Sequence, residues 1–401
     1  MNKKLMWHSD LSIHTGCGRT ARNNLRYLQI PYLTRAIGWN ISCPMCNSLK
    51  PNVNTTYDLV GLPKYPVGGI DPRAIISKML NEIASFQPEI LIQYGDIFDF
   101  AFLQPNNNKN VYSEAIRQNF PNLNMVFYMT IDAEGNKPGI NLDIYNKLIV
   151  SSYFGQKVIK EEYGKDSEVV YHGYDPDIYF NTSLQQKRDY RRKIGLTNEF
   201  VIMTMARNQF RKNLPATIRI FAEFAKGKNT KLLLFTALNA PHAVHNLNEI
   251  IKRNNIKDKI IVIDSGPHKP LRDEDINIYY NISDVYISTS YAEGFNLPVL
   301  ESMVVGTPCI VSGYSAHKEL VEDKGIVVPI KGYTIDQQKE YQIMDRKFGI
   351  VDEDKFVEEL TRVYNDRNLL RVMGQKSKIF AKELTWVESA KKIYSILQGL
   401  K

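Results

Sequence analysis

The chain is poor in cysteine and has no long hydrophobic run. Four of its 401 residues are cysteine (Cys17, Cys43, Cys46 and Cys309), which fits a reducing compartment, where disulfides are rare. No apolar stretch reaches the roughly 20 residues that a membrane-spanning helix needs. The N-terminal segment has two lysines but lacks the apolar core of a signal peptide. We therefore expect a cytoplasmic protein, in contact at most with the inner face of a membrane.

The chain also lacks a dominant charge of one sign. Its 51 basic and 43 acidic residues give a formal net charge of +8. The excess is uneven, because Arg19, Arg22 and Arg26 share one face of an expected helix and residues 187–193 hold a second basic cluster. Two interpretations stay open, a solvated helix face or a surface for an acidic partner such as anionic lipid, a phosphorylated acceptor or nucleic acid. No RNA- or DNA-binding motif accompanies the clusters, so nucleic acid ranks last.

Cys43-Pro-Met-Cys46 has the spacing of a redox pair or of half a zinc site. No second pair of ligands stands nearby, and no thioredoxin-like context surrounds it. We interpret the two cysteines as ordinary thiols and predict no metal site.

Short apolar runs alternate with helical patterns along most of the chain. In the second half, the runs at 199–206, 231–235, 259–263 and 285–290 alternate with helices expected at 214–224, 245–253 and 275–282. This βαβ alternation predicts a parallel α/β sheet. In the first half we expect a glycine-rich turn up to Thr20, then a helical stretch to about Arg35, and another helix at 72–86. Residues 333–348 read as an insertion or irregular segment.

The stretch around which the chain is organised is Glu293-Gly-Phe-Asn-Leu-Pro-Val-Leu-Glu301. It predicts a strand end, a glycine turn and a helix over residues 297–305, with Pro298 in the first turn. Such a turn directs free backbone N–H groups and the positive helix end at a phosphate or a sugar hydroxyl. On spacing alone, Glu293 could instead cap the helix, and Glu301 could lie on its solvated face.

This stretch resembles the E-x7-E signature of retaining, nucleotide-sugar-dependent glycosyltransferases of the GT-B fold, in particular the GT4-like group. The family pattern E-G-F-G-L-P-x-x-E is matched except at Asn296, which stands where the family has glycine. Asn accepts a left-handed backbone better than most residues, so the loop should persist. Downstream, only Glu319 aligns with the family's G-G-x-x-E.

Other positions match the family motif by motif. Arg207 and Lys212 have the spacing of G-R-x-x-x-x-K-G, whose cations grip the nucleotide diphosphate, although Arg211 competes for either role. Gly16 and Gly18 resemble the first glycine loop, Asp132 resembles the aspartate that contacts the transferred sugar, and Asp264 ends a strand where the base would sit. The resemblance assigns Gly294, Phe295, Asn296 and Leu297 to sugar and phosphate binding, Glu301 to the ribose and Glu293 to the donor sugar.

The resemblance implies two Rossmann-like domains facing a cleft, at 1–175 and 176–380, with a terminal helix at 381–401 crossing back. It implies transfer of a sugar from a UDP-, GDP- or ADP-sugar to a hydroxyl of a glycan, lipid or other acceptor. No Asp-x-Asp stands in the expected metal-binding place, so we predict chemistry without a metal or other cofactor. The rivals are a GT-B epimerase or phosphorylase, and a non-catalytic nucleotide-sugar or glycan-binding module.

Overall fold

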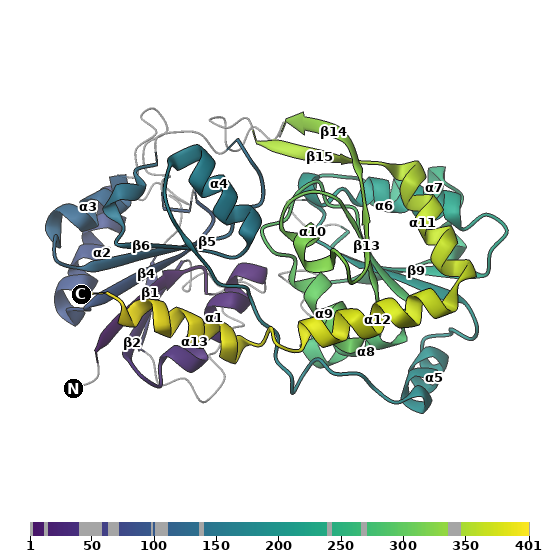
Figure 1. Cartoon of the computed structure of the whole chain (residues 1–401), viewed down its shortest axis with the longest axis horizontal. Coiled ribbons are helices and arrows are strands. Elements are labelled where there is room, and N and C mark those ends of the chain that lie inside the picture. Colours follow the sequence, from purple (N-terminus) through teal and green to yellow (C-terminus); the bar gives the residue numbers. More distant parts are fainter. Residues whose placement is uncertain are drawn as a thin grey trace. The chain divides into compact units, whose positions relative to one another are not determined.

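The computed structural model describes residues 3–11, 15–39, 58–62, 72–97, 99–100, 111–135, 140–238, 243–265, 271–335 and 346–400. The chain divides into two compact units, each built on its own parallel sheet (Figure 1). Unit 1 comprises Met1–Ile131, Asn136–His172 and Trp386–Lys401. Unit 2 comprises Asp132–Gly135 and Gly173–Thr385. Cys43 and Cys46 lie outside the described residues.

In its described ranges, unit 1 has a seven-stranded sheet with the order β3-β2-β1-β4-β5-β6-β7, and its neighbouring strands are parallel. Its strands are β1 (Lys4–Ser9), β2 (Leu33–Trp39), β3 (Asp58–Leu62), β4 (Ile90–Gly95), β5 (Asn124–Met129), β6 (Lys147–Val150) and β7 (Glu168–Val169). Its α-helices are α1 (Gly16–Leu28), α2 (Pro72–Phe86), α3 (Val111–Asn119), α4 (Tyr153–Tyr163) and α13 (Trp386–Gln398).

The C-terminal helix α13 packs on the N-terminal helix α1, as the resemblance predicts (Figure 1). Leu25 of α1 and Ile393 of α13 belong to the same buried cluster. Ser389 Oγ donates to Asn24 Oδ1 at 3.1 Å across the buried contact. Helix α13 therefore contributes to the core of unit 1.

The predicted helix to Arg35 is wrong. Helix α1 ends at Leu28, and strand β2 begins at Leu33. Pro31 explains the break, because a proline disfavours helical backbone in the residue before it and cannot donate to the preceding turn.

The described part of unit 2 has a six-stranded parallel sheet with the order β10-β9-β8-β11-β12-β13. Its strands are β8 (Phe200–Met205), β9 (Thr230–Thr236), β10 (Ile260–Asp264), β11 (Val285–Ser288), β12 (Cys309–Ser312) and β13 (Ile326–Val328). Its α-helices are α5 (Leu184–Lys193), α6 (Leu214–Phe224), α7 (Leu247–Arg253), α8 (Asp273–Ile282), α9 (Leu297–Val305), α10 (Ala316–Val321), α11 (Glu353–Asn365) and α12 (Arg367–Ala381).

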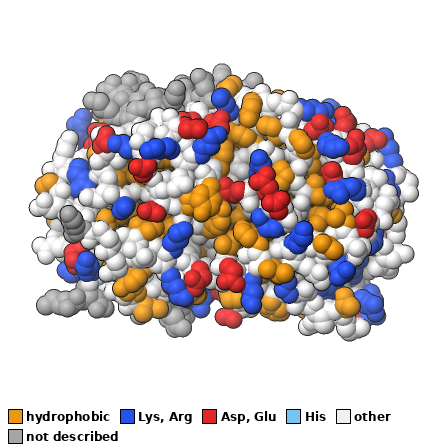
Figure 2. Space-filling view, in the orientation of Figure 1, with side chains coloured by type: hydrophobic (Ala, Val, Ile, Leu, Met, Phe, Trp, Pro, Cys, Tyr) orange, Lys and Arg blue, Asp and Glu red, His pale blue; other side chains and the backbone are white. Residues whose placement is uncertain are grey.

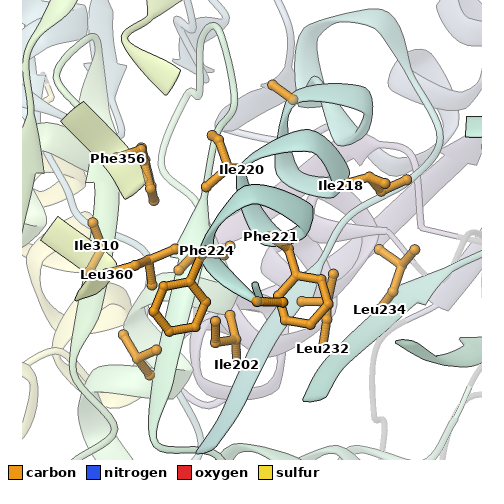
Figure 3. Close-up of a cluster of buried hydrophobic side chains, with 14 of the residues drawn as sticks. Ile202, Ile218, Ile220, Phe221, Phe224, Leu232, Leu234, Ile310, Phe356 and Leu360 are labelled. Carbon is orange, nitrogen blue, oxygen red and sulfur yellow. The ribbon is translucent and has the colours of Figure 1, made fainter. Parts of the chain in front are cut away.

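The sheet of unit 2 is covered by apolar helix faces. Ile218 and Phe221 of α6 pack over Ile202, Leu232 and Leu234 of strands β8 and β9 (Figure 3). A strand buried on both faces reads as a continuous apolar run, which is why these strands were recognisable in the sequence. The packed sheet provides a rigid base for the loops at its carboxyl edge.

The predicted irregular segment at 333–348 is wrong at both ends. Residues up to Ile335 belong to β14 (Ile330–Ile335), and Lys347 and Phe348 belong to β15 (Lys347–Val351). The two strands pair antiparallel, with Tyr333 opposite Gly349. Side chains along β14 alternate between half-buried and exposed, as expected for a strand with one solvated face.

The three arginines of α1 do not form a uniformly solvated face. Arg22 is half-buried, and its Nη1 donates to the carbonyl oxygen of Leu11 at 2.8 Å. Arg26 is exposed and lies over the ring of Tyr27. Arg22 thus ties α1 to Leu11, just after β1. Among the described residues, no helix is long and apolar enough to cross a membrane.

Candidate functional site

The centre of the candidate site is Glu293, five residues beyond the carboxyl end of strand β11. Its carboxylate accepts hydrogen bonds from Lys212 Nζ at 2.6 and 2.7 Å and from Arg211 Nη1 at 2.9 Å. Ser290 Oγ donates a further hydrogen bond at 2.7 Å. Only 3% of Glu293 is exposed. A buried carboxylate with two cations and a hydroxyl donor is stabilised as an anion.

Burial and the neighbouring charges shift the pKa values of both Glu293 and Lys212. Burial by itself would raise the pKa of Glu293, but the adjacent Lys212 and Arg211 hold it well below its usual range. Burial, followed by repulsion from Arg211, lowers the pKa of Lys212 to about 8 even though Glu293 opposes that shift. Lys212 is therefore a cation that titrates only slightly above neutral pH.

Two helices begin at this site with the same local sequence. Asn213-Leu-Pro opens α6 and Asn296-Leu-Pro opens α9, and both asparagines have left-handed backbone, with φ of 49° and 81°. Neither asparagine side chain caps its own helix. The Asn296 side chain instead donates to Ser288 Oγ at 3.1 Å, and that of Asn213 to the Thr289 carbonyl at 3.3 Å.

The end of β11 therefore holds the starts of both helices. Pro215 and Pro298 have no N–H, and the N–H groups of Ala216 and Val299 donate to the Asn213 and Asn296 carbonyls at 3.1 and 3.0 Å. Because the asparagine side chains bond to Ser288 and Thr289, they leave the N–H groups of Leu214 and Leu297 uncapped within the described residues. A helix N-terminus attracts anions through these N–H groups and through its positive dipole end. Two such termini beside Lys212 and Arg211 suit a ligand with two linked phosphates.

Ser315 supports Glu293 from the next loop. Its Oγ accepts a hydrogen bond from the Glu293 backbone N–H at 2.8 Å. Its backbone has φ of 58° and ψ of −159°, a region populated almost only by glycine. If Glu319 is aligned with the family's G-G-x-x-E, Ser315 stands at the first glycine. Ser315 thus keeps the backbone conformation that the family's glycine adopts without strain, but does so as a residue with a side chain.

His317 is a buried neighbour of Glu293 that the sequence analysis left without a role. Ser312 Oγ donates to the Ser290 carbonyl, so it accepts from His317 Nε2–H at 2.9 Å. Burial lowers the pKa of His317 to about 4, which keeps the ring neutral. Its Nδ1 is then a buried acceptor without a partner in the described part of the chain.

Glu301 lies on α9, five residues beyond Asn296, and is 1% exposed. Its Oε2 accepts a hydrogen bond from the hydroxyl of Tyr280 on α8 at 2.9 Å. A solvated helix-face position for Glu301 is therefore wrong, since the side chain is buried.

Asp132 belongs to unit 2 and pairs with two arginines. Its Oδ1 accepts from Arg346 Nη1 at 3.2 Å, and its Oδ2 lies 3.5 Å from Arg211 Nε. Arg211 thus bridges Asp132 and Glu293. The β14–β15 hairpin reinforces this arrangement, because the backbone N–H of Lys347 donates to the carbonyl of Glu134 at 2.9 Å.

The remaining predicted residues are distributed over both units. Arg207 is exposed just beyond β8, near enough for its charge to lower the pKa of Lys212. Asp264 ends edge strand β10 and is exposed, whereas Phe295 and Leu297 are buried beside Glu293. Gly16 and Gly18 lie in unit 1 at the start of α1, where Thr15 Oγ1 accepts from Gly18 N–H at 3.3 Å.

Sequence reasoning did not assign Asn213, Ser315 or Arg346. The repeated Asn-Leu-Pro was the available signal for Asn213. No local signal marked Arg346, because its partner Asp132 lies 214 positions away. Within the described residues, no group of three or more His, Cys, Asp or Glu side chains is placed to hold a metal ion.

Residues 186–380 match the family model described as glycosyl transferases group 1. The alpha-monoglucosyldiacylglycerol synthase of Streptococcus pneumoniae is 30% identical over 138 residues, which cover 34% of this chain and 30% of that protein. The O-antigen biosynthesis glycosyltransferase WclY of Escherichia coli is 26% identical over 196 residues, covering 47% of this chain and 51% of that protein. The matched segments span about half the length of these relatives or less.

Solved structures resemble the whole chain. Anabaena HepE in complex with UDP and glucose has a TM-score of 0.73 at 13% identity, covering 99% of this chain and 100% of that one. Sucrose-phosphate synthase from Thermosynechococcus elongatus has a TM-score of 0.75 at 14% identity, covering 99% of each chain. At such identities the likeness shows the fold alone, and it confirms the predicted fold class. Residues 186–380 belong to the glycosyl transferases group 1 family, and the whole chain has the GT-B fold.

Proposed function

We propose that the chain transfers a sugar from a nucleotide-diphosphate sugar to an acceptor hydroxyl, with retention of the anomeric configuration. The observation that carries this proposal is the convergence of Lys212, Arg211 and the N-termini of α6 and α9 at the carboxyl edge of one parallel sheet. Ligands of open α/β sheets bind at that edge. The cluster lies within the segment that matches the glycosyl transferases group 1 model.

In this proposal, Arg207 and Lys212 bind the diphosphate, and the backbone N–H groups of residues 294–297 bind phosphate and sugar. As the glycosidic bond breaks, the leaving diphosphate gains negative charge, and fixed cations stabilise it in the transition state. Arg207, Arg211, Lys212 and Arg346 bring four positive charges against the two of Glu293 and Asp132. This excess of positive charge can balance the negative charge of the leaving diphosphate without a metal ion.

The acidic side chains have separate proposed roles. Glu301 binds the ribose hydroxyls, and Glu293 and Asp132 lie at the donor sugar, where a carboxylate steadies positive charge at the anomeric carbon. Glu293 is also the anion that holds Lys212 and Arg211 in place, at 2.6 and 2.9 Å. Gly16 and Gly18 form the first glycine loop, and Asp264 lies near the base.

The comparisons guide the choice of donor and acceptor. HepE has been solved with UDP and glucose, so UDP-glucose is the first donor to test. The relative named alpha-monoglucosyldiacylglycerol synthase makes a diacylglycerol lipid a rational acceptor to include. We propose a hexose as the transferred sugar.

The test is nucleoside-diphosphate release from UDP-, GDP- and ADP-sugars by wild type, Lys212→Ala and Glu301→Ala. Lys226→Ala is the matched control, because that lysine is exposed and, among the residues that the structure describes, pairs only with neighbouring Glu223. Release from one donor that is lost in the two site variants and kept in the control supports the proposal. Thermal stabilisation by a nucleotide without any release favours a binding module. If no donor releases a nucleoside diphosphate and no nucleotide stabilises the protein against heat, the proposed donor site is refuted.

A further inference from the structure

Unit 2 contains a basic cavity that the proposed function does not use. It is open to solvent, has a volume of about 600 Å³ and lies between α5 and the end of α8. Its lining includes Lys187, Arg188, Arg191 and Arg192, with Asp284 as the acidic member and Leu184 at its rim. Four cations against one carboxylate give the cavity a clear excess of positive charge.

The single carboxylate in the lining is already engaged. Arg191 Nη2 donates to Asp284 at 2.8 Å, and Arg191 Nε donates to the Ile282 carbonyl at 2.9 Å. Arg191 is thus a structural clamp between α5 and the start of β11. It neutralises Asp284, and Arg192 pairs with Asp189 of the same helix at 2.5 Å, so Lys187 and Arg188 are the lining cations that remain to be balanced.

Two of the cations have no partner of their own. Within the described part of the chain, the side chains of Lys187 and Arg188 make no hydrogen bond and no ion pair. Lys187 is half-buried. Burial, then the positive charges of Lys378 on α12 and of Arg191, lower its pKa. Like charges crowded around a partly desolvated lysine are unfavourable, and a bound anion would relieve that repulsion.

The cavity lies at the opposite end of the sheet from the donor site. Arg191 Nη1 donates to the carbonyl of Glu199, just before β8, whereas Arg207 follows the other end of that strand. The six residues of β8 span roughly 20 Å. A ligand in this cavity would therefore not occupy the proposed nucleotide-sugar site.

Exposed apolar side chains border the basic lining. Leu184 is 74% exposed and Phe180 is 51% exposed. The backbone N–H of Phe180 donates to Asn277 Oδ1 on α8, and its carbonyl accepts from Asn281, which lines the cavity. In Figure 2, Lys and Arg side chains gather around exposed hydrophobic atoms at the lower right, over α5.

We propose that this α5–α8 cavity is a second anion site that binds a phosphoryl group through Lys187 and Arg188. Lysine and arginine are the side chains that proteins use to bind phosphate oxygens. Two kinds of ligand have such a phosphoryl group: a soluble phosphate compound and the headgroup of an anionic phospholipid. The exposed Leu184 and Phe180 suit the second source, since an apolar rim can enter the interfacial region of a bilayer while the cations meet the headgroup.

The test compares Lys187→Ala/Arg188→Ala with Lys391→Ala/Lys392→Ala, which removes the same charge from exposed positions of α13. Both doubles are made in a Lys212→Ala background, so that phosphate bound at the proposed donor site does not contribute. The soluble arm titrates inorganic pyrophosphate by calorimetry. The lipid arm measures co-sedimentation with phosphatidylglycerol vesicles, with phosphatidylcholine vesicles as the neutral reference.

We expect the α5 double variant to weaken binding in one arm by on the order of tenfold, as loss of two charge-assisted contacts implies. The α13 double variant should change it less than about twofold. Loss in the soluble arm identifies a phosphate compound, and loss in the vesicle arm alone identifies a lipid headgroup. No binding in either arm, or equal losses in the two variants, overturns the proposal.

Donor hydrolysis by Lys187→Ala/Arg188→Ala in the otherwise wild-type chain should be unchanged, which keeps this inference separate from the proposed function.

Discussion

Above about pH 8 the proposed donor site should lose one of its cations, because burial and the neighbouring Arg211 lower the pKa of Lys212 to about 8. Lys212 is charged below that pH and neutral above it. At about pH 9, roughly one Lys212 side chain in ten would carry a proton, as follows from a pKa near 8. Since kcat/KM reports the ionisation of the free enzyme, its value should fall on the order of tenfold between about pH 7 and pH 9.

The assay is nucleoside-diphosphate release at donor concentrations well below KM. Lys212→Arg is the informative variant, because arginine stays charged throughout this range. Its activity should be lower at neutral pH, since the guanidinium cannot reproduce both short contacts of Lys212 Nζ to Glu293, but its profile should stay flat to about pH 9. Lys226→Ala should keep the wild-type decline. A wild-type profile that is flat up to about pH 9.5, or the same decline in Lys212→Arg, would refute the reasoning.

Three further perturbations test other parts of the structure. Arg207→Ala should slow donor turnover on the order of 100-fold, because one charge-assisted hydrogen-bond donor supplies ~3 kcal/mol in the transition state. A loss below about threefold in the release assay would show that Arg207 does not have that role. In urea, the free energy of unfolding of Ser315→Gly should exceed that of Ser315→Ala by about 1 kcal/mol. Both variants lose the hydrogen bond to Glu293, but only glycine relieves the backbone strain at φ 58°. An alanine variant at least as stable as the glycine variant would contradict the strain. Phe221→Ala should lower the free energy of unfolding by about 3 to 5 kcal/mol, because its ring is fully buried between α6 and the sheet, and denaturant unfolding with little change would show that this core is loosely packed.

Much of unit 2 could be predicted because its signals are local. The helices expected at 214–224 and 297–305 coincide with α6 and α9, where a proline stands in the first turn of each. The left-handed backbone expected at Asn296 is present, with φ of 81°. The errors at Arg35 and at 333–348 have different causes. Pro31 was a local signal that was overlooked, whereas the β14–β15 pairing joins residues that no short window contains.

The site itself could be predicted only in part. The E-x7-E stretch and the Arg207–Lys212 spacing identified the residue types, but not that Lys212 and Glu293, 81 positions apart, bond at 2.6 Å. The sequence makes Arg211 a competitor for the role of either Arg207 or Lys212, and in the structure Arg211 bridges Glu293 and Asp132. Arg346 escaped notice because ion pairs across such sequence distances leave no periodic pattern.

The sequence by itself determined the α/β class, most of the helices and strands around the site, and the resemblance to a glycosyltransferase family, because hydrophobic periodicity, turn residues and short motifs act within a few positions of the chain. Only the tertiary structure decided which charges meet, which of them are buried, and how their pKa values move. It also placed the cations of α5 in a cavity of their own. Coulomb energies and desolvation depend on distance and burial in space, and the parallel sheet sets both by bringing together residues from β8, β11 and the loops between them.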